Sequence, residues 1–173
     1  MRTDPIKILM VDDENVILDV AEEYFQKKGY EVFTAGNGIE ALDVLSREKI
    51  GCVFTDINMP VMDGLDLAEK IRMKDNTLPI VVMTGYPSLD NTIQTLKNGV
   101  IDYLITPVNL EQMELTLKRI LRERELFVEN LILKEEVERQ ERLKKLNNEL
   151  LERVQEVNTL NRVMEDFSTT DSS

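Results

Sequence analysis

The chain has 173 residues and a formal net charge of −12 at neutral pH, which argues against direct binding to nucleic acid or to an anionic membrane. It contains one cysteine and no histidine. An intrachain disulfide, a histidine-dependent nucleophile system and a zinc site with histidine ligands are therefore excluded. No apolar segment is long enough to span a bilayer, so a cytoplasmic location is expected.

Residues 6–106 alternate between short apolar runs rich in β-branched side chains and segments with helical spacing. The short runs, typical of buried parallel strands, are Ile6–Val11, Glu31–Ala35, Gly51–Asp56, Pro79–Thr84 and Ile101–Ile105. Helices are predicted between them at about 14–29, 38–47, 64–74 and 88–98. Five strands that alternate with helices predict an α/β fold with a doubly wound parallel sheet.

Polar side chains stand where the predicted strands end. Asp12 and Asp13 follow the first strand, Asp56 ends the third, Thr84 ends the fourth, and Thr106-Pro107 follows the fifth. Ligands of such sheets bind beyond the carboxyl ends of the strands, so we expect these side chains to form one site. Three carboxylates in one site repel one another unless a cation joins them. Mg²⁺ prefers such oxygen ligands, which makes it the expected cofactor.

An aspartate beside Mg²⁺ can act as the nucleophile in phosphoryl transfer. Asp56 is the best candidate, and the Thr84 hydroxyl could donate a hydrogen bond to a phosphoryl oxygen. The residue types alone do not select Asp56 over Asp12 or Asp13. Taken separately, Asp12 and Asp13 could cap the first helix, and the stretch from Asp56 to Gly64 could be a plain turn.

Four segments closely resemble the response regulator receiver family of two-component signalling. They are residues 10–14 (MVDDE), 55–64 (TDINMPVMDG), 83–85 (MTG) and 102–107 (DYLITP), and they follow the family's order and spacing over about residues 5–120. The resemblance implies a flavodoxin-like sheet of strand order 2-1-3-4-5. It implies Asp56 as acceptor of a phosphoryl group from a sensor histidine kinase or a phosphotransfer protein. Such a domain catalyses only its own phosphorylation and dephosphorylation, and is not otherwise an enzyme.

The resemblance also assigns roles around Asp56. Mg²⁺ would be held by Asp12, Asp13, Asp56 and the backbone carbonyl of Asn58. Thr84 would be the switch hydroxyl that moves toward the phosphoryl group, and Tyr103 the switch aromatic that turns inward when Thr84 moves.

Thr106 departs from the family pattern. The residue before Pro107, which would follow a cis peptide bond, is normally a lysine that pairs with the phosphoryl group, whereas threonine brings a hydroxyl and no charge. An alternative function is therefore a pseudo-receiver, an interaction module with little or no phosphorylation of Asp56. A phosphatase of the haloacid dehalogenase type is a further alternative, but it needs an aspartate two residues after the nucleophile, where this chain has Asn58.

Residues 110–167 contain neither glycine nor proline, which predicts one helix of roughly 87 Å. Its apolar residues recur close to every 3.5 residues, with one irregular step of four like a stutter. They are Leu143, Leu146, Leu150, Val154, Val157, Leu160, Met164 and Phe167. The pattern predicts a coiled coil over 121–167, continuous with the last receiver helix, and a disordered polar tail at 168–173. The seam predicts a homodimer; packing on a downstream domain is the alternative.

Overall fold

The computed structural model describes residues 4–85, 88, 90, 93, 97, 99–100, 102–107 and 109–170. The chain divides into two compact units, Met1–Leu121 and Arg122–Ser173. The helix predicted over 88–98 falls mostly outside the described residues. The described elements are β1 (Lys7–Val11), α1 (Asn15–Lys27), β2 (Glu31–Ala35), α2 (Gly38–Arg47), β3 (Cys52–Asp56), α3 (Gly64–Lys74), β4 (Ile80–Thr84), β5 (Asp102–Ile105) and α5 (Leu110–Thr170).

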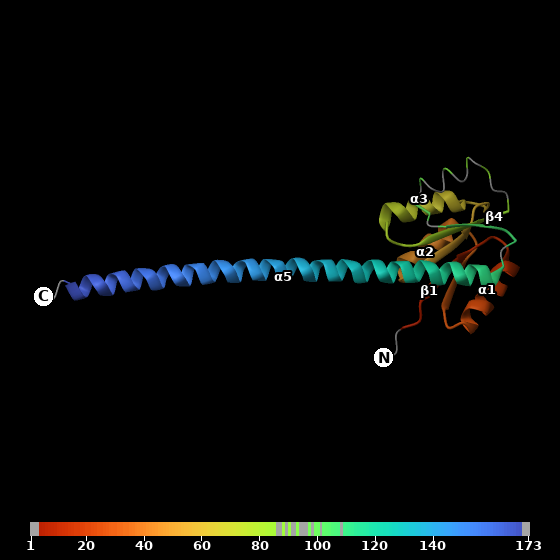
Figure 1. Cartoon of the computed structure of the whole chain (residues 1–173). Helices are drawn as coiled ribbons and strands as arrows, with labels where there is room; N and C mark the ends of the chain where they lie inside the picture. Colours follow the sequence, from red (N-terminus) through yellow and green to blue (C-terminus); the bar gives the residue numbers. More distant parts are fainter. Residues whose placement is uncertain are drawn as a thin grey trace. The chain divides into compact units, whose positions relative to one another are not determined.

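The five strands form one parallel sheet in the order β2-β1-β3-β4-β5. Figure 1 shows β1 and β4 of this sheet with α1 and α3 on its opposite sides. This confirms the predicted doubly wound α/β fold and its strand order, and all five strands end at the predicted residues. β1 lies between β2 and β3, so that Val11 is paired with both Ala35 and Thr55. The strand order changes direction at β1 and β3, and the ligand crevice of such a sheet lies beyond their carboxyl ends.

Two apolar clusters cover the two faces of the sheet. Leu9 and Val11 of β1 pack with side chains from α2 and α3. Ile8 and Met10 point to the other face and pack with α1 and the first turns of α5. All five residues of β4 are buried, as expected for a parallel sheet covered on both faces. The strand ends are therefore held on a rigid support.

Polar contacts fasten the start of α5 to the end of α1. The Tyr24 hydroxyl donates a hydrogen bond of 2.7 Å to Oε2 of Glu114. Lys28 and Lys118 form ion pairs with the same carboxylate at 3.8 and 3.0 Å. The hydrogen bond from Tyr24 and the lysine charges hold the pKa of Glu114 below its ordinary value. These contacts fix the first turns of α5 within the first unit.

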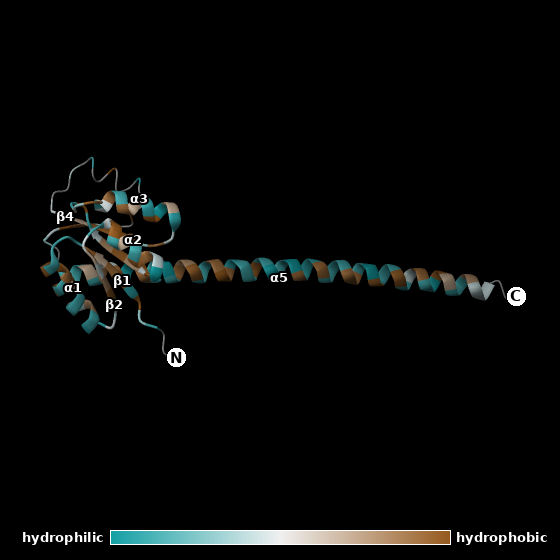
Figure 2. Cartoon of the chain, turned by 180° about the vertical axis from the view of Figure 1, so that it is seen from behind, coloured by the Kyte–Doolittle hydropathy of each residue, from teal (hydrophilic) through white to brown (hydrophobic). Residues whose placement is uncertain are grey.

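Helix α5 continues to Thr170, three residues beyond the end that the sequence predicts. Hydroxyls of Ser168, Thr169 and Thr170 donate to carbonyls three or four residues earlier, a local pattern that helices accommodate. Figure 2 shows apolar residues, in brown, recurring among polar ones along α5. They are exposed in the single chain, Leu150 for example at 60%. None of the described helices contains an apolar stretch that could span a bilayer.

Val61, in the loop between β3 and α3, has a left-handed backbone with a φ of 70°, and its side chain is 81% exposed. Such a conformation costs a β-branched residue about 1–3 kcal/mol. We expect Val61→Gly to raise the free energy of unfolding by about 1 kcal/mol, after allowance for glycine's larger entropy in the unfolded chain. Urea unfolding measures the change. Val61→Ala keeps an unfavourable φ, and an equal gain from alanine would contradict the explanation.

Candidate functional site

Three aspartates lie together beyond the carboxyl ends of β1 and β3. Asp12 and Asp13 directly follow β1, and Asp56 is the last residue of β3. Oxygens of the three carboxylates lie within 4.8 Å of one another. In the described part of the chain, this is the one group of three or more acidic or cysteine side chains close enough to share a metal ion. The gathering of these residues predicted from the strand ends is therefore confirmed.

Asp12 is held in place by its neighbours and is only 5% exposed. Its backbone N–H donates to the carbonyl of Ala35 at 3.1 Å, and its Oδ1 accepts the backbone N–H of Glu14 at 2.9 Å. The N-cap of α1 is Glu14, without a capping hydrogen bond from its side chain. Asp12 and Asp13 therefore do not cap the helix in the simple way that their position allows.

Asp56 is half-buried, and its Oδ1 accepts the backbone N–H of Ile57 at 2.8 Å. The start of α3 packs directly on its backbone, because a Cβ at Gly64 would lie 2.0 Å from the Asp56 carbonyl oxygen. The N–H of Gly64 donates to the carbonyl of Ile57 at 2.9 Å, and Asp63 caps the helix. The stretch 56–64 is thus more than a plain turn. Gly64 allows the start of α3 to approach the backbone of Asp56 closely, which fixes the position of Asp56. The sequence pattern, in which Gly64 is a turn residue, does not reveal this role.

The charged neighbours of these carboxyls are acidic. Burial, with the charges of Asp56, Asp13 and Glu14, raises the pKa of Asp12 to about 6. Burial, with the charges of Asp13 and Glu14, also raises the pKa of Asp56, although backbone N–H groups oppose the shift. A divalent cation would remove this repulsion, and clustered carboxylate oxygens are the ligands that Mg²⁺ prefers. The residues therefore fit the ion that the sequence resemblance implies.

The raised pKa of Asp12 predicts that the stability of the metal-free protein depends on pH. Folded Asp12 keeps its proton up to about pH 6, whereas the unfolded carboxyl loses it near 3.8. The folded state binds more protons in this window, so the free energy of unfolding falls as pH rises from about 4 to 6, by at most about 3 kcal/mol. Urea unfolding in chelator across this range measures the slope. Mg²⁺ should restore stability at neutral pH, and an unchanged slope in Asp12→Asn would refute the assignment.

A family comparison agrees with this geometry. The model of the response regulator receiver domain matches residues 8–118, which include all three aspartates. The chain belongs to the response regulator receiver family. Residues from 119 onward, including the whole second unit, lie outside the match.

Several known receivers are similar to this one. Sporulation initiation phosphotransferase F of Bacillus subtilis is 31% identical over 115 residues, which are 66% of this chain and 93% of that protein. The transcriptional regulatory protein ZraR of Klebsiella oxytoca is 33% identical over 121 residues, 70% of this chain and 27% of ZraR. A solved CheY-like receiver of Methanospirillum hungatei JF-1 has a TM-score of 0.68 and 33% identity, covering 70% of this chain and 97% of that one. This receiver spans about a quarter of ZraR.

The remaining receiver residues lie on β4, on β5 and directly after β5. Thr84 is buried at the end of β4, and its carbonyl accepts the N–H of Thr106 at 2.7 Å. The Thr106 hydroxyl oxygen lies 3.0 Å from the place of a Cβ on Gly85, and the Thr106–Pro107 peptide is cis, as the resemblance implies. The Tyr103 hydroxyl is buried and has no hydrogen-bond partner among the described residues. Thr84 and Thr106 are thus joined through their backbones, and the Tyr103 side chain is turned inward.

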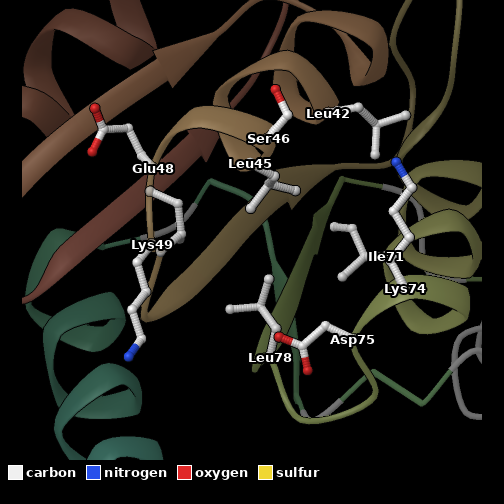
Figure 3. A pocket seen from close by; sticks show the side chains of 10 residues that line it. Leu42, Leu45, Ser46, Glu48, Lys49, Ile71, Lys74, Asp75 and Leu78 are labelled. Carbon is white, nitrogen blue, oxygen red and sulfur yellow. The ribbon is translucent and has the colours of Figure 1, made fainter.

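A cavity of about 260 Å³ lies near the amino-terminal ends of β3 and β4, at the opposite end of the strands from the aspartates. Figure 3 shows Leu45, Ile71 and Leu78 pointing into it, with Lys74 beside Leu42 at its border. Its lining comes from the carboxyl-terminal parts of α2 and α3 and from residues that precede β3 and β4. The three aspartates lie at the opposite, carboxyl-terminal ends of the strands, so this cavity is not part of the receiver's acidic site.

Proposed function

We propose that this receiver accepts a phosphoryl group on Asp56 from a histidine kinase or a phosphotransfer protein, in a reaction that depends on Mg²⁺. The observation that carries the proposal is the group of three carboxylates within 4.8 Å at the ends of two central strands. Membership of the receiver family supports it. Apart from its own phosphorylation and dephosphorylation the domain is proposed to have no enzymatic activity, since Asn58 offers no proton donor of the kind that a haloacid dehalogenase phosphatase needs.

Asp56 acts as the nucleophile in this proposal. One of its carboxylate oxygens forms a bond to phosphorus, while the bond from phosphorus to the donor atom breaks and the donor keeps that electron pair. The N–H of Ile57 holds the carboxylate in one orientation. Asp12, Asp13, Asp56 and the backbone carbonyl of Asn58 would hold Mg²⁺, which when bound neutralises charge on the phosphoryl oxygens.

Thr84 and Tyr103 are proposed to respond to the phosphoryl group. The Thr84 hydroxyl donates a hydrogen bond to a phosphoryl oxygen, which draws the end of β4 toward Asp56. The Tyr103 side chain, on the neighbouring strand β5 that pairs with β4, would then stay in the inward position described above. Its buried hydroxyl lacks a partner among the described residues, and an unsatisfied buried hydroxyl costs free energy. This cost makes the inward position of Tyr103 less stable, so that the position of Thr84 can decide whether Tyr103 stays there.

Thr106 favours a second candidate function, the pseudo-receiver, because no charge stands at the position where the family has lysine. Thr106→Lys separates the two functions when both proteins are incubated with acetyl phosphate and Mg²⁺. We expect the unmodified chain to be phosphorylated and the lysine variant to differ only in the amount of phosphorylated protein. Phosphorylation of the lysine variant alone would establish the pseudo-receiver instead. Thr84→Lys is no substitute control, since Thr84 is itself part of the proposed switch.

The second unit is proposed to dimerise and so to pass the signal on. Its apolar residues, Leu143 and Leu160 among them, are exposed in the single chain, and burying them requires another surface. A second copy of the same helix supplies one with matching spacing. A cytoplasmic location and the lack of direct nucleic-acid binding remain predictions from composition.

A further inference from the structure

The second unit contains a regular heptad repeat from Leu143 to Phe167. Its a positions, seven residues apart, are Leu143, Leu150, Val157 and Met164. Its d positions, three residues after each of these, are Leu146, Arg153, Leu160 and Phe167. The step of four from Leu150 to Val154, which looks like a stutter, therefore does not shift the phase of the repeat. Arg153 occupies the core position, and Val154 stands beside it at position e.

The repeat extends upstream to Leu126 in a shifted phase. Leu126, Asn130, Leu133 and Val137 follow one another at steps of four, three and four residues. The next two core positions come at steps of three, at Gln140 and then at the first residue of the regular repeat. With the step from Leu143 to Leu146 this makes three successive steps of three, equivalent to two stammers, which overwind a coiled coil locally. Polar residues thus stand at defined levels of a core that runs over 126–167.

We propose that residues 126–167 of two copies pair in parallel and in register, so that each core residue faces its own counterpart. The inference rests on the dimerisation proposed above and adds the orientation and register of the partner. In this arrangement Asn130 faces Asn130 of the second copy, and their amide groups can bond to each other. A slip of one heptad would set Asn130 against Val137. A polar asparagine at an a position is known to specify register.

The charges beside the core balance one another in the parallel arrangement. In a parallel pair a residue at g faces the residue at e five positions later in the second copy. Glu129 then faces Lys134, an attractive pair, whereas Glu136 faces Glu141, a pair of like charges. Glu149 faces the uncharged Val154. In the regular repeat from Leu143 onward, no g residue meets a like charge in this way.

An antiparallel pair is disfavoured by the same residues. Matching Leu143 with Leu160 of the second copy brings Glu149 opposite Glu156. Symmetry repeats this contact, so two pairs of like charges flank the core. Like charges placed opposite each other oppose association.

Arg153 forms the weakest level of the parallel core, because two arginines meet there. Glu149 and Glu156 stand four residues before and three residues after it on the same helix, within the range of helical ion pairs. The guanidinium group of each Arg153 can therefore point out of the core toward a carboxylate of its own helix, while the methylene groups of the side chain remain in the core.

Single-cysteine cross-linking of the full chain tests the orientation. Leu143→Cys and Leu160→Cys are made separately, and Cys52 is retained because it is fully buried. Each variant is oxidised mildly at a concentration at which light scattering detects a dimer. We expect both variants to form self-linked dimers. Gln155→Cys, at the outermost f position, is the matched control and should stay unlinked.

The failures of the two proposals are distinguishable. If neither variant links with itself but a mixture of Leu143→Cys and Leu160→Cys does, the dimer is antiparallel; the orientation inferred here is then overturned and dimerisation stands. A monomer in light scattering overturns both. A trimer or tetramer overturns the two-stranded pairing.

Discussion

Asp56→Asn is expected to abolish phosphorylation by acetyl phosphate, a loss of at least about a hundredfold. The amide lacks the carboxylate's negative charge and is a poor nucleophile toward phosphorus. It can still accept the N–H of Ile57 through its oxygen, so the loop after β3 should keep its structure. Mass spectrometry of the intact protein, after incubation with acetyl phosphate and Mg²⁺, measures the fraction that carries one phosphoryl group.

Two controls accompany this variant. Asp19→Asn removes an exposed carboxylate from α1 and should leave phosphorylation unchanged. Removal of Mg²⁺ by a chelator should suppress phosphorylation of the unmodified chain, because the three carboxylates then repel one another and the incoming phosphoryl group. Persistent phosphorylation of Asp56→Asn would move the acceptor to another carboxylate and contradict the role of Asp56.

Gly64→Ala is expected to lower the free energy of unfolding by about 3 kcal/mol and to reduce phosphorylation of Asp56 strongly. The added methyl group would stand 2.0 Å from the carbonyl oxygen of Asp56. Because that obstacle is backbone, either the start of α3 or the end of β3 must move. Urea unfolding measures the loss of stability, and acetyl phosphate labelling measures the effect on the site.

Gly36→Ala is the matched control for Gly64→Ala. A Cβ there would lie 3.3 Å from Oε2 of Glu40, the far end of a flexible side chain, so a small shift should relieve the contact. We expect a change in unfolding free energy within about 1 kcal/mol and normal phosphorylation. Equal effects of the two variants would show that the loss of stability and of phosphorylation does not depend on the close contact between Gly64 and Asp56.

The strands could be predicted from the sequence because burial on both faces leaves a plain pattern. β4 reads Ile-Val-Val-Met-Thr and is buried throughout, and the strand ends at the threonine that follows its apolar run. The start of α1 is marked less plainly in the sequence. Asp12 and Asp13 look like capping residues, yet Asp12 accepts the N–H of Glu14 and α1 begins at Asn15. A capping pattern does not reveal that a carboxylate belongs to a metal site.

The membership of the acidic site was predictable, but its internal geometry was not. Strand ends of a parallel sheet meet at one edge, so Asp12, Asp13 and Asp56 could be grouped before any distance was known. The close approach of Gly64 to Asp56 depends on how α3 docks on the loop. The buried hydroxyl of Tyr103 depends on packing from both β5 and its surroundings. Neither leaves a pattern in the sequence.

The start of α5 illustrates the same limit. Spacing predicted a long helix, and the structure has one over Leu110–Thr170. The hydrogen bond between Tyr24 and Glu114 joins residues 90 positions apart, and no local pattern announces such a pair. This anchor connects the receiver core with the helix that is proposed to carry the signal.

Locating the phosphoryl group within the unmodified chain tests the central claim most directly. The protein is incubated with saturating acetyl phosphate and Mg²⁺, digested, and its peptides are sequenced by tandem mass spectrometry. The account predicts one modified residue, Asp56. A phosphoryl group on any other residue, or none at all under these conditions, would contradict it.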